Sequence, residues 1–231
     1  MSNGRIAILI PSLGRRTLFD RWYESFKEKS TSGLCDIFLW NVDTDPKLPE
    51  YNNLPNDVTR HIGPREHEYF GFVPSCNSLA GLHPEYSFFA SSEDDMIFLR
   101  RDWDCEAVAS FTDGKAKVIK LHDAAETVES YIVNDKWINA TGYFHFPMFP
   151  GYGCTAIREL ATRLDRYQVS SNGPVFRHEV QTRDGFCSGT FETMEPERRS
   201  AALTEQYIYY KWLKNGGIDN EVERIRKNIR A

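Results

Sequence analysis

The sequence predicts an α/β fold, in which a mostly parallel central sheet is flanked by helices. Three observations predict it. A strand, a helix and a second strand follow one another between residues 5 and 42, as in a βαβ unit. Apolar runs end at polar or acidic residues, as strands do at the ligand-binding edge of such a sheet. The 231 residues, 41% hydrophobic and 13% aromatic, favour a single globular domain spanning residues 1–231.

The βαβ unit begins near the N-terminus. Residues 5–10 form a β-rich run that stops at the turn sequence Pro11-Ser12-Leu13-Gly14. Residues 17–29 predict a helix, because three apolar side chains recur on one face every four residues: Leu18, Trp22 and Phe26. Residues 35–42 predict the second strand, and Asp43 opens the polar segment that closes it. The two strands are therefore expected to be parallel and to end at one edge of the sheet.

Three consecutive carboxylates, Glu93, Asp94 and Asp95, stand between two apolar runs, residues 86–89 and 96–99. Because buried carboxylates must be paired or bind a metal, we expect the first run to be a buried strand that holds the acids at the rim of the sheet. A hard divalent cation there takes some oxygens from the protein and the rest from a phosphate-bearing ligand. The alternative is a solvated acidic turn between two strands.

The rest of the chain gives weaker patterns. We expect a short strand near residues 58–62, a loop and short helix over 71–81, a helix over 104–112 and a strand over 117–121. From Thr141 to Cys154, aromatic residues alternate with glycine and proline. This segment suits a loop that covers a pocket and stacks on a ring or sugar, or one that only packs on the core. Three further helices and one strand are expected over residues 155–166, 197–214, 221–231 and 174–178.

Composition and cysteine spacing narrow the class of protein. The net charge of −5 gives no general attraction to nucleic acid or to an anionic membrane. Five scattered cysteines without a C-x-x-C pair fit reduced thiols better than a disulfide framework or a zinc site. The first apolar run, Ile6 to Ile10, is too short for a signal peptide, and no stretch is long enough to span a membrane. We therefore expect a cytoplasmic protein.

Taken in order, these motifs resemble those of the GT-A glycosyltransferases, closest to the small, family-2-like proteins of bacteria and phages. The resemblance is carried by Ile10-Pro11-Ser12 with Arg15, a strand ending in Val42-Asp43-x-Asp45, Asn77 before a short helix, Asp94-Asp95-Met96, and Trp103. It covers roughly residues 5–110 and weakens beyond them.

The resemblance implies a GT-A fold with a nucleotide-sugar-binding half, residues 1–110, and an acceptor-side half with the C-terminal helices, residues 111–231. It also implies an enzyme, a hexosyl- or pentosyltransferase. Such an enzyme moves a sugar from a nucleotide-sugar, here expected to be a UDP-sugar, with Mn²⁺ or Mg²⁺ bridging the diphosphate.

Residue by residue, the resemblance places Pro11, Ser12 and Arg15 against the nucleoside. It gives Asp43 a contact to the base or ribose, and it places Asn77 along the donor site.

The acidic triplet stands where the family has its Asp-x-Asp motif. Asp95 is the first choice for a metal ligand and Asp94 the second, with Glu93 beside them in the donor site. A C-terminal histidine often completes the metal site in this family, and His178 is the candidate. Carboxylate oxygen suits Mg²⁺ and Mn²⁺, and manganese also accepts imidazole.

This sequence departs from the family pattern in three ways. The first acid of the triplet is glutamate, and there is no Gln-x-x-Arg-Trp, so processive polysaccharide synthesis is not supported. No acidic pair before a helix stands out as a general base; the weak candidates are Asp165, Glu179 and Asp184. Whether the reaction retains or inverts configuration therefore stays open.

Other functions remain open at this stage. A nucleotidyltransferase would share the sheet, but it usually has a glycine-rich basic loop, and residues 12–16 contain one glycine. A non-catalytic nucleotide-sugar-binding module would not need both Asp94 and Asp95. The acceptor could be a glycan, a protein, a small molecule or a hydroxymethylated DNA base, and three arginine doublets could form a local basic patch for DNA: Arg15-Arg16, Arg100-Arg101 and Arg198-Arg199.

Overall fold

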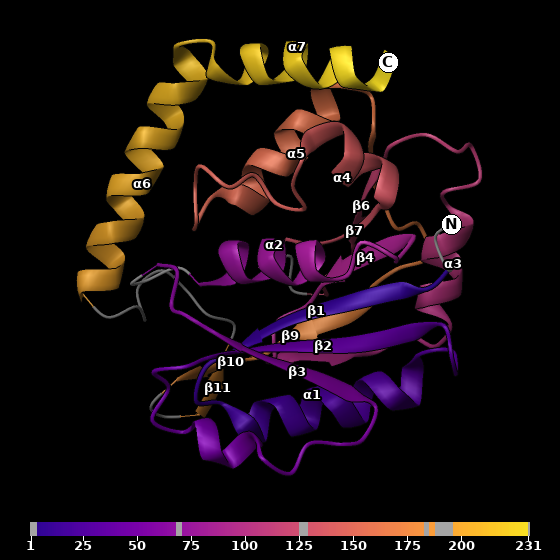
Figure 1. The fold of residues 1–231 in the computed structure, drawn as a ribbon, viewed down its shortest axis with the longest axis vertical. Coiled ribbons are helices and arrows are strands. Elements are labelled where there is room, and N and C mark those ends of the chain that lie inside the picture. Colours follow the sequence, from indigo (N-terminus) through magenta and orange to yellow (C-terminus); the bar gives the residue numbers. More distant parts are fainter. Residues whose placement is uncertain (1–3, 68–70, 125–128, 183–184, 188–195, 231) are drawn as a thin grey trace.

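The structure is a computed structural model that describes residues 4–67, 71–124, 129–182, 185–187 and 196–230 (Figure 1). Its centre is a seven-stranded sheet in the order β3-β2-β1-β4-β7-β6-β8. The strands are β1 (Ile6–Ser12), β2 (Cys35–Val42), β3 (Val58–Gly63), β4 (Phe88–Ser91), β6 (Val118–Leu121), β7 (Ser130–Asn134) and β8 (Tyr167–Val169). All run parallel except β7, which is antiparallel to both of its neighbours. The predicted fold class is confirmed.

Helices cover both faces of this sheet. The helices are α1 (Arg16–Lys29), α2 (Phe72–Leu82), α3 (Trp103–Ala109), α4 (Asp135–Thr141), α5 (Gly153–Arg163), α6 (Pro196–Lys214) and α7 (Gly217–Arg230), with a 3-10 turn η1 (Leu48–Tyr51). In Figure 1, α1 lies below the sheet, and α2, α4 and α5 lie above it, with α7 across the top. Observed helix ends differ from the predicted ones by a few residues, and α7 begins earlier than its expected start at residue 221.

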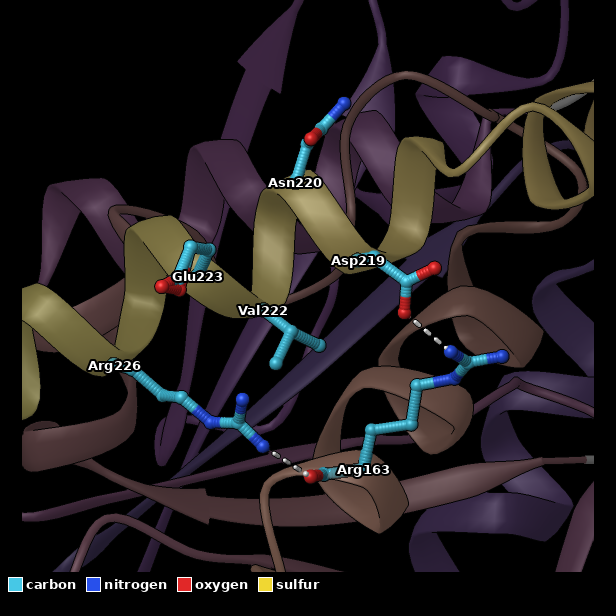
Figure 2. Close-up of a pocket in the computed structure, with 6 residues that line it drawn as sticks. All are labelled: Arg163, Asp219, Asn220, Val222, Glu223 and Arg226. Carbon is cyan, nitrogen blue, oxygen red and sulfur yellow. Dashed lines mark hydrogen bonds and ion pairs between the residues drawn. The ribbon is translucent and has the colours of Figure 1, made fainter.

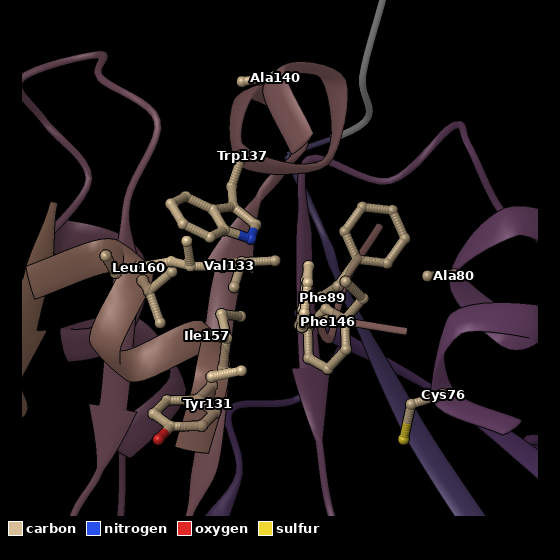
Figure 3. Close-up of a cluster of buried hydrophobic side chains, with 14 of the residues drawn as sticks. Cys76, Ala80, Phe89, Tyr131, Val133, Trp137, Ala140, Phe146, Ile157 and Leu160 are labelled. Carbon is tan, nitrogen blue, oxygen red and sulfur yellow. The ribbon is translucent and has the colours of Figure 1, made fainter. Parts of the chain in front are cut away.

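Alternation along β1 divides the core into two layers. Ile6, Ile8 and Ile10 face α1 and α3, whereas Ala7 and Leu9 face α2 and the C-terminal helices. The three α1 residues expected on one face are all buried: Leu18, Trp22 and Phe26. On the other side of the sheet, side chains of α4 and α5 pack around Val133 of β7, and Phe89 packs beside Phe146 (Figure 3).

Strand β7 and helix α4 were not predicted. The five residues of β7 are all buried, so this strand shows no alternation of polar and apolar side chains. Asn134 ends β7 and caps α4, because its side chain accepts a hydrogen bond from the Trp137 amide. The insertion of an antiparallel strand beside β4 places Ser130 at the carboxyl end of β4, where its hydroxyl donates to the Ser91 carbonyl at 2.5 Å.

Two short antiparallel ribbons lie outside the central sheet. One pairs β5 (Met96–Phe98) with β9 (Phe176–His178), and the other pairs β10 (Val180–Thr182) with β11 (Gly185–Cys187). The apolar run after the acidic triplet therefore leaves the main sheet and binds a strand some 80 residues later in the chain.

An ion pair and a hydrogen bond join the C-terminal helix α7 to α5. Arg163 of α5 pairs with Asp219 of α7 at 2.6 Å, and Arg226 donates to the Arg163 carbonyl at 3.3 Å (Figure 2). A hollow of about 510 Å³ lies between these side chains, and the two contacts join α5 to α7 across it. Within the described ranges, no helix combines the length and apolarity that a membrane span requires.

Candidate active site

The carboxyl ends of β1 and β4 bring Ser12 and the acidic triplet to one edge of the sheet. The turn after β4 is held to its surroundings by Ser92, whose amide donates to the Leu9 carbonyl at 3.0 Å and whose hydroxyl accepts from the Trp22 indole at 2.8 Å. The chain then reverses into β5. Strand β4 therefore ends just before the acids and holds them at the rim of the sheet, as expected, and the burial of Asp94 and Asp95 contradicts the alternative of a solvated turn.

Asp94 points into the protein and is fully buried. Its Oδ2 accepts a 2.5 Å hydrogen bond from Ser12, and its Oδ1 lies 2.5 Å from the guanidinium of Arg15. The Tyr51 hydroxyl lies 2.6 Å from the Ser12 hydroxyl and accepts the Arg15 amide at 3.0 Å. Burial raises the pKa of Asp94, and the neighbouring Asp95 charge adds to this effect, while Arg15 opposes it.

Asp95 faces the β5–β9 ribbon. Its Oδ1 lies 3.1 Å from Nε2 of His178, and its Oδ2 accepts from Arg15 at 2.9 Å. The Asp95 carbonyl also accepts the Glu179 amide at 2.8 Å. Burial opposes ionisation of Asp95, but the bonds from His178 and Arg15 outweigh it and lower the pKa of this carboxyl. Arg15 thus bridges two adjacent carboxylates.

Glu93, Asp95 and His178 form a compact group of metal-ligating side chains. One ligand atom from each lies within 4.8 Å of the others, and Glu93 Oε2 is 3.7 Å from His178 Nε2. Glu93 and Asp95 reach the same side of the turn, whereas Asp94 points to Ser12 and Arg15. The geometry therefore favours Glu93 over Asp94 as the second carboxylate ligand. Two oxygens and one imidazole nitrogen form a donor set that suits Mn²⁺.

His178 reaches this group because β9 pairs with β5, in a register that sets Met96 opposite His178. The side chain of Asp123 also fixes the strand by accepting the His178 amide at 3.2 Å. Burial lowers the pKa of His178, but its bonds to Asp95 and Glu93 outweigh this and raise the pKa to about 10. A metal ion would therefore have to displace a proton from the imidazole.

The predicted nucleoside contacts lie at the carboxyl ends of two neighbouring strands, β1 and β2. Pro11 and Ser12 belong to β1, and Arg15 follows it beside the acids. Asp43 is exposed just beyond the end of β2. Asp45 is the buried acid of that segment, and it accepts the Gly14 amide at 2.7 Å. The nucleoside role of Asp43 stays a prediction.

Asn77 forms hydrogen bonds with the aromatic loop, the segment 142–152 between α4 and α5. Its Oδ1 accepts the amides of Phe144 and His145 at 3.0 and 2.8 Å, and its Nδ2 donates to the His145 carbonyl at 2.9 Å. These bonds give Asn77 a clear part in holding the loop. Its contact with the donor stays a prediction.

The three candidate bases lie in different places. Asp165 precedes β8 in a left-handed turn (φ 56°), at the opposite edge of the sheet from the acidic triplet. The structure does not bring it together with Asp94 and Asp95. Glu179 follows β9 at the site and pairs with Arg177 and, at 2.6 Å, with Arg21. Asp184 lies outside the described residues.

Two buried side chains at the site were missed. Tyr51 ends η1 and is 1% exposed. In the sequence it is a lone tyrosine in a polar segment, and no pattern connects it to Ser12. Asp123, 0% exposed, follows β6 at the same edge as the triplet. The rule that singled out Glu93–Asp95, an acid just after an apolar strand, would also have found Asp123.

Four arginines of the doublets have acidic partners. Arg16 pairs with Asp20 at 2.7 Å. Two others also have acidic partners, Arg100 with Glu106 at 2.6 Å and Arg101 with Glu28 at 3.8 Å. Arg15 is bound to the triplet. The side chain of Arg198 is outside the described part.

Comparison with known proteins places this fold. No protein-family pattern and no curated protein sequence matches the chain. Among solved structures, S. aureus TarS 1–349 in complex with UDP superposes with a TM-score of 0.57 at 11% identity, over 77% of this chain and 61% of that one. The mannosyltransferase PcManGT from Pyrobaculum calidifontis, in complex with GDP-Man and Mn²⁺, gives 0.57 at 12% identity, over 75% and 56%. TarS 1–349 with UDP-GlcNAc gives 0.56 at 10% identity, over 75% and 58%.

One of these neighbours is named a mannosyltransferase and binds GDP-Man and Mn²⁺, and the TarS structures hold UDP or UDP-GlcNAc. The fold that they share with this chain is the GT-A fold. The expected GT-A fold is confirmed. The chain spans less than two thirds of the length of either protein, 61% of TarS 1–349 and 56% of PcManGT.

Proposed function

We propose that this chain is a metal-dependent glycosyltransferase that moves a sugar from a nucleotide-sugar, with UDP as the favoured nucleotide, to an acceptor. One observation carries the proposal. On a GT-A fold, the carboxyl end of β4 and the β5–β9 ribbon hold Glu93, Asp95 and His178 within 4.8 Å of one another. This donor set stands where a parallel sheet binds its ligands.

Glu93, Asp95 and His178 would hold the divalent cation, with manganese favoured because one ligand is imidazole. A cation bound there offsets the charge that develops on a departing diphosphate. The surrounding protein keeps Asp95 ionised. It also fixes His178, whose imidazole contacts Asp95 and whose backbone amide donates to Asp123. Asp94 contributes by anchoring Arg15 and Ser12, and through them the loop after β1.

Arg15 supplies a fixed positive charge beside the metal ligands. Its side chain is 39% exposed while its guanidinium bridges Asp94 and Asp95. This places a guanidinium, which recognises phosphate oxygens well, on the solvent side of the acids. Pro11, Ser12 and Asp43 complete the nucleoside side of the proposal.

Glu179 is the general-base candidate that lies at this edge. Burial opposes ionisation of Glu179, but Arg177 and Arg21 outweigh it and lower the pKa, so the group is a carboxylate at neutral pH. A carboxylate can accept a proton from an acceptor hydroxyl. If Glu179 serves this purpose, the reaction inverts configuration; a retaining enzyme would not need it.

Calorimetric titration of UDP, and then of GDP, with and without Mn²⁺ tests the proposal. We expect binding that depends on Mn²⁺ in the wild type and is lost in Asp95→Asn. Glu24→Gln removes an exposed carboxylate of α1 and is the matched control, expected to bind as the wild type does. Binding of neither nucleotide under any condition, or equal binding by Asp95→Asn, would contradict the proposal.

A further inference from the structure

A second hollow lies outside the metal group, between α6 and the loop that leads into α5. Its volume is about 780 Å³, which is in the usual range for small-molecule sites. The loop contributes Met148, Phe149 and Pro150. Helix α6 contributes residues at helical spacing along one face: Glu197, Ser200, Ala201, Thr204, Glu205, Ile208 and Trp212. We call this hollow the α6 groove.

The α6 groove is held in shape before any ligand binds. Oε1 of Glu205 accepts the amides of Gly151 and Tyr152, at 2.8 and 3.1 Å, which ties the loop to the helix. Phe149 is buried, and its ring packs 5.4 Å from that of Trp212. These contacts fix both walls, so a ligand would meet a preformed site.

Large apolar side chains nevertheless face solvent here. Met148 is 59% exposed and Ile208 is 50% exposed, and they stand on opposite walls of the α6 groove. Burying them under a ligand would remove apolar surface from water.

Helix α5, which follows the loop wall of the α6 groove, is linked to the edge of the sheet that carries the metal group. Its loop wall runs directly into Gly153, the first residue of α5. Arg158 of α5 pairs with Glu129, whose neighbour Ser130 lies at the carboxyl end of β4. In the view of Figure 1, α6 lies on the same side as β10 and β11, which follow β9.

The polar lining selects by charge. Glu197 and Glu205 bring two carboxylates, Ser200 and Thr204 bring two hydroxyls, and His67 brings an imidazole, while no lysine or arginine is among the described residues that line the α6 groove. A phosphate-bearing or otherwise anionic ligand would be repelled by the carboxylates. Carboxylates and hydroxyls instead pair with the hydroxyls of an uncharged sugar.

The two kinds of lining are separated along α6. Carboxylates and hydroxyls occupy the N-terminal half of the helix face, and Ile208 and Trp212 occupy its C-terminal half beside Met148 and Phe149. This division matches a ligand with one hydroxylated end and one apolar end. It matches an aromatic or aliphatic glycoside better than a plain oligosaccharide.

We propose that the α6 groove is the acceptor subsite and that it takes a neutral glycoside with an apolar aglycone. The assignment as acceptor rests on the proposed glycosyltransferase function. The preference for a neutral over an anionic glycoside rests on the lining alone.

Binding of 4-nitrophenyl β-D-glucopyranoside to the full chain, followed by ligand-observed NMR without nucleotide or metal, tests the lining. 4-Nitrophenyl phosphate is the anionic probe of similar aglycone. We expect the glycoside to bind and the phosphate not to bind. Equal binding of the two probes, or no binding of the glycoside, would overturn the proposal.

Two serine variants of α6 locate the site. Ile208→Ser removes an apolar side chain of the α6 groove and should weaken glycoside binding by about fivefold to tenfold. Leu203→Ser is the matched control, because Leu203 is 49% exposed on the same helix but does not line the groove. Equal weakening in both variants would show that the glycoside binds elsewhere.

The position of the subsite is tested by adding Mn²⁺ and UDP to the same samples. Bound Mn²⁺ should broaden the NMR lines of the bound glycoside, and Glu93→Gln should restore them. With Mn²⁺ binding established by calorimetry, unchanged lines would overturn the acceptor assignment. A failure of the nucleotide titration would instead contradict the glycosyltransferase function and leave the metal-free glycoside result standing.

Discussion

Adjacent carboxylates in this site have opposite environments. Asp94 is turned inward to Ser12 and Arg15, and burial raises its pKa. Asp95 is turned toward His178, and the bonds from His178 and Arg15 overcome burial and lower its pKa. One residue therefore organises the loop after β1, while its neighbour is prepared to bind a cation.

This difference predicts which acids bind metal. Glu93→Gln should weaken Mn²⁺ affinity by roughly 10- to 100-fold, because it removes a charged oxygen ligand. Asp94→Asn should leave Mn²⁺ affinity within about threefold of the wild type and lower the free energy of unfolding by about 1–3 kcal/mol, because it weakens a buried charged hydrogen bond. Calorimetric Mn²⁺ titration and denaturant unfolding measure the two effects. A larger loss of Mn²⁺ affinity in Asp94→Asn than in Glu93→Gln would reverse the assignment.

His178 makes metal binding depend on pH. Its pKa in the metal-free protein is raised to about 10, so the imidazole is protonated at neutral pH, and a metal must displace that proton. Mn²⁺ affinity should therefore rise with pH, by about tenfold per unit between pH 6 and 8. His178→Gln should flatten this dependence. Mn²⁺ affinity that does not change over this range in the wild type would rule out the imidazole as a ligand.

At the scale of elements, the start of α5 is packed against the aromatic loop and α2. A Cβ atom on Gly153 would lie 2.6 Å from the Phe146 carbonyl oxygen and 2.9 Å from both γ-carbons of Val73. Only glycine fits at this junction, so the first turn of α5 can pack closely against α2 and residue 146.

Alanine substitutions test this packing. Gly153→Ala should lower the free energy of unfolding by about 1–3 kcal/mol through overpacking. Gly81→Ala lies inside α2, where an added Cβ atom would have no other atom within 4 Å. It should raise the free energy of unfolding by about 0.5–1 kcal/mol, because alanine favours the helix. Denaturant unfolding gives both values. A Gly153→Ala protein as stable as the wild type would show that the junction has room.

At the scale of the whole molecule, the site depends on contacts that no local pattern contains. The βαβ unit and the strand leading to the acids were predictable, because helical spacing and apolar runs are local. His178 was singled out by family resemblance, but its contact with Asp95 joins residues 83 positions apart through the β5–β9 pairing. That pairing required the chain to reverse at Asp95, which three carboxylates in a row do not specify.

Other differences have equally physical causes. The choice between Glu93 and Asp94 as ligand depends on which way each side chain leaves the turn, and sequence order does not determine this. Asp165 lies at the far edge because it precedes a strand parallel to β6, whereas the acids follow β4. The family resemblance placed Asn77 in the donor site because of its position in the sequence. Its side-chain amide is instead bonded to a loop almost 70 residues later.

Pulsed electron paramagnetic resonance of the Mn²⁺-loaded protein tests most directly whether Glu93, Asp95 and His178 form one metal centre on this GT-A fold. We expect a nitrogen hyperfine coupling from the imidazole, present in the wild type and absent in His178→Gln. Bound Mn²⁺ with no nitrogen coupling in the wild type would contradict the claim.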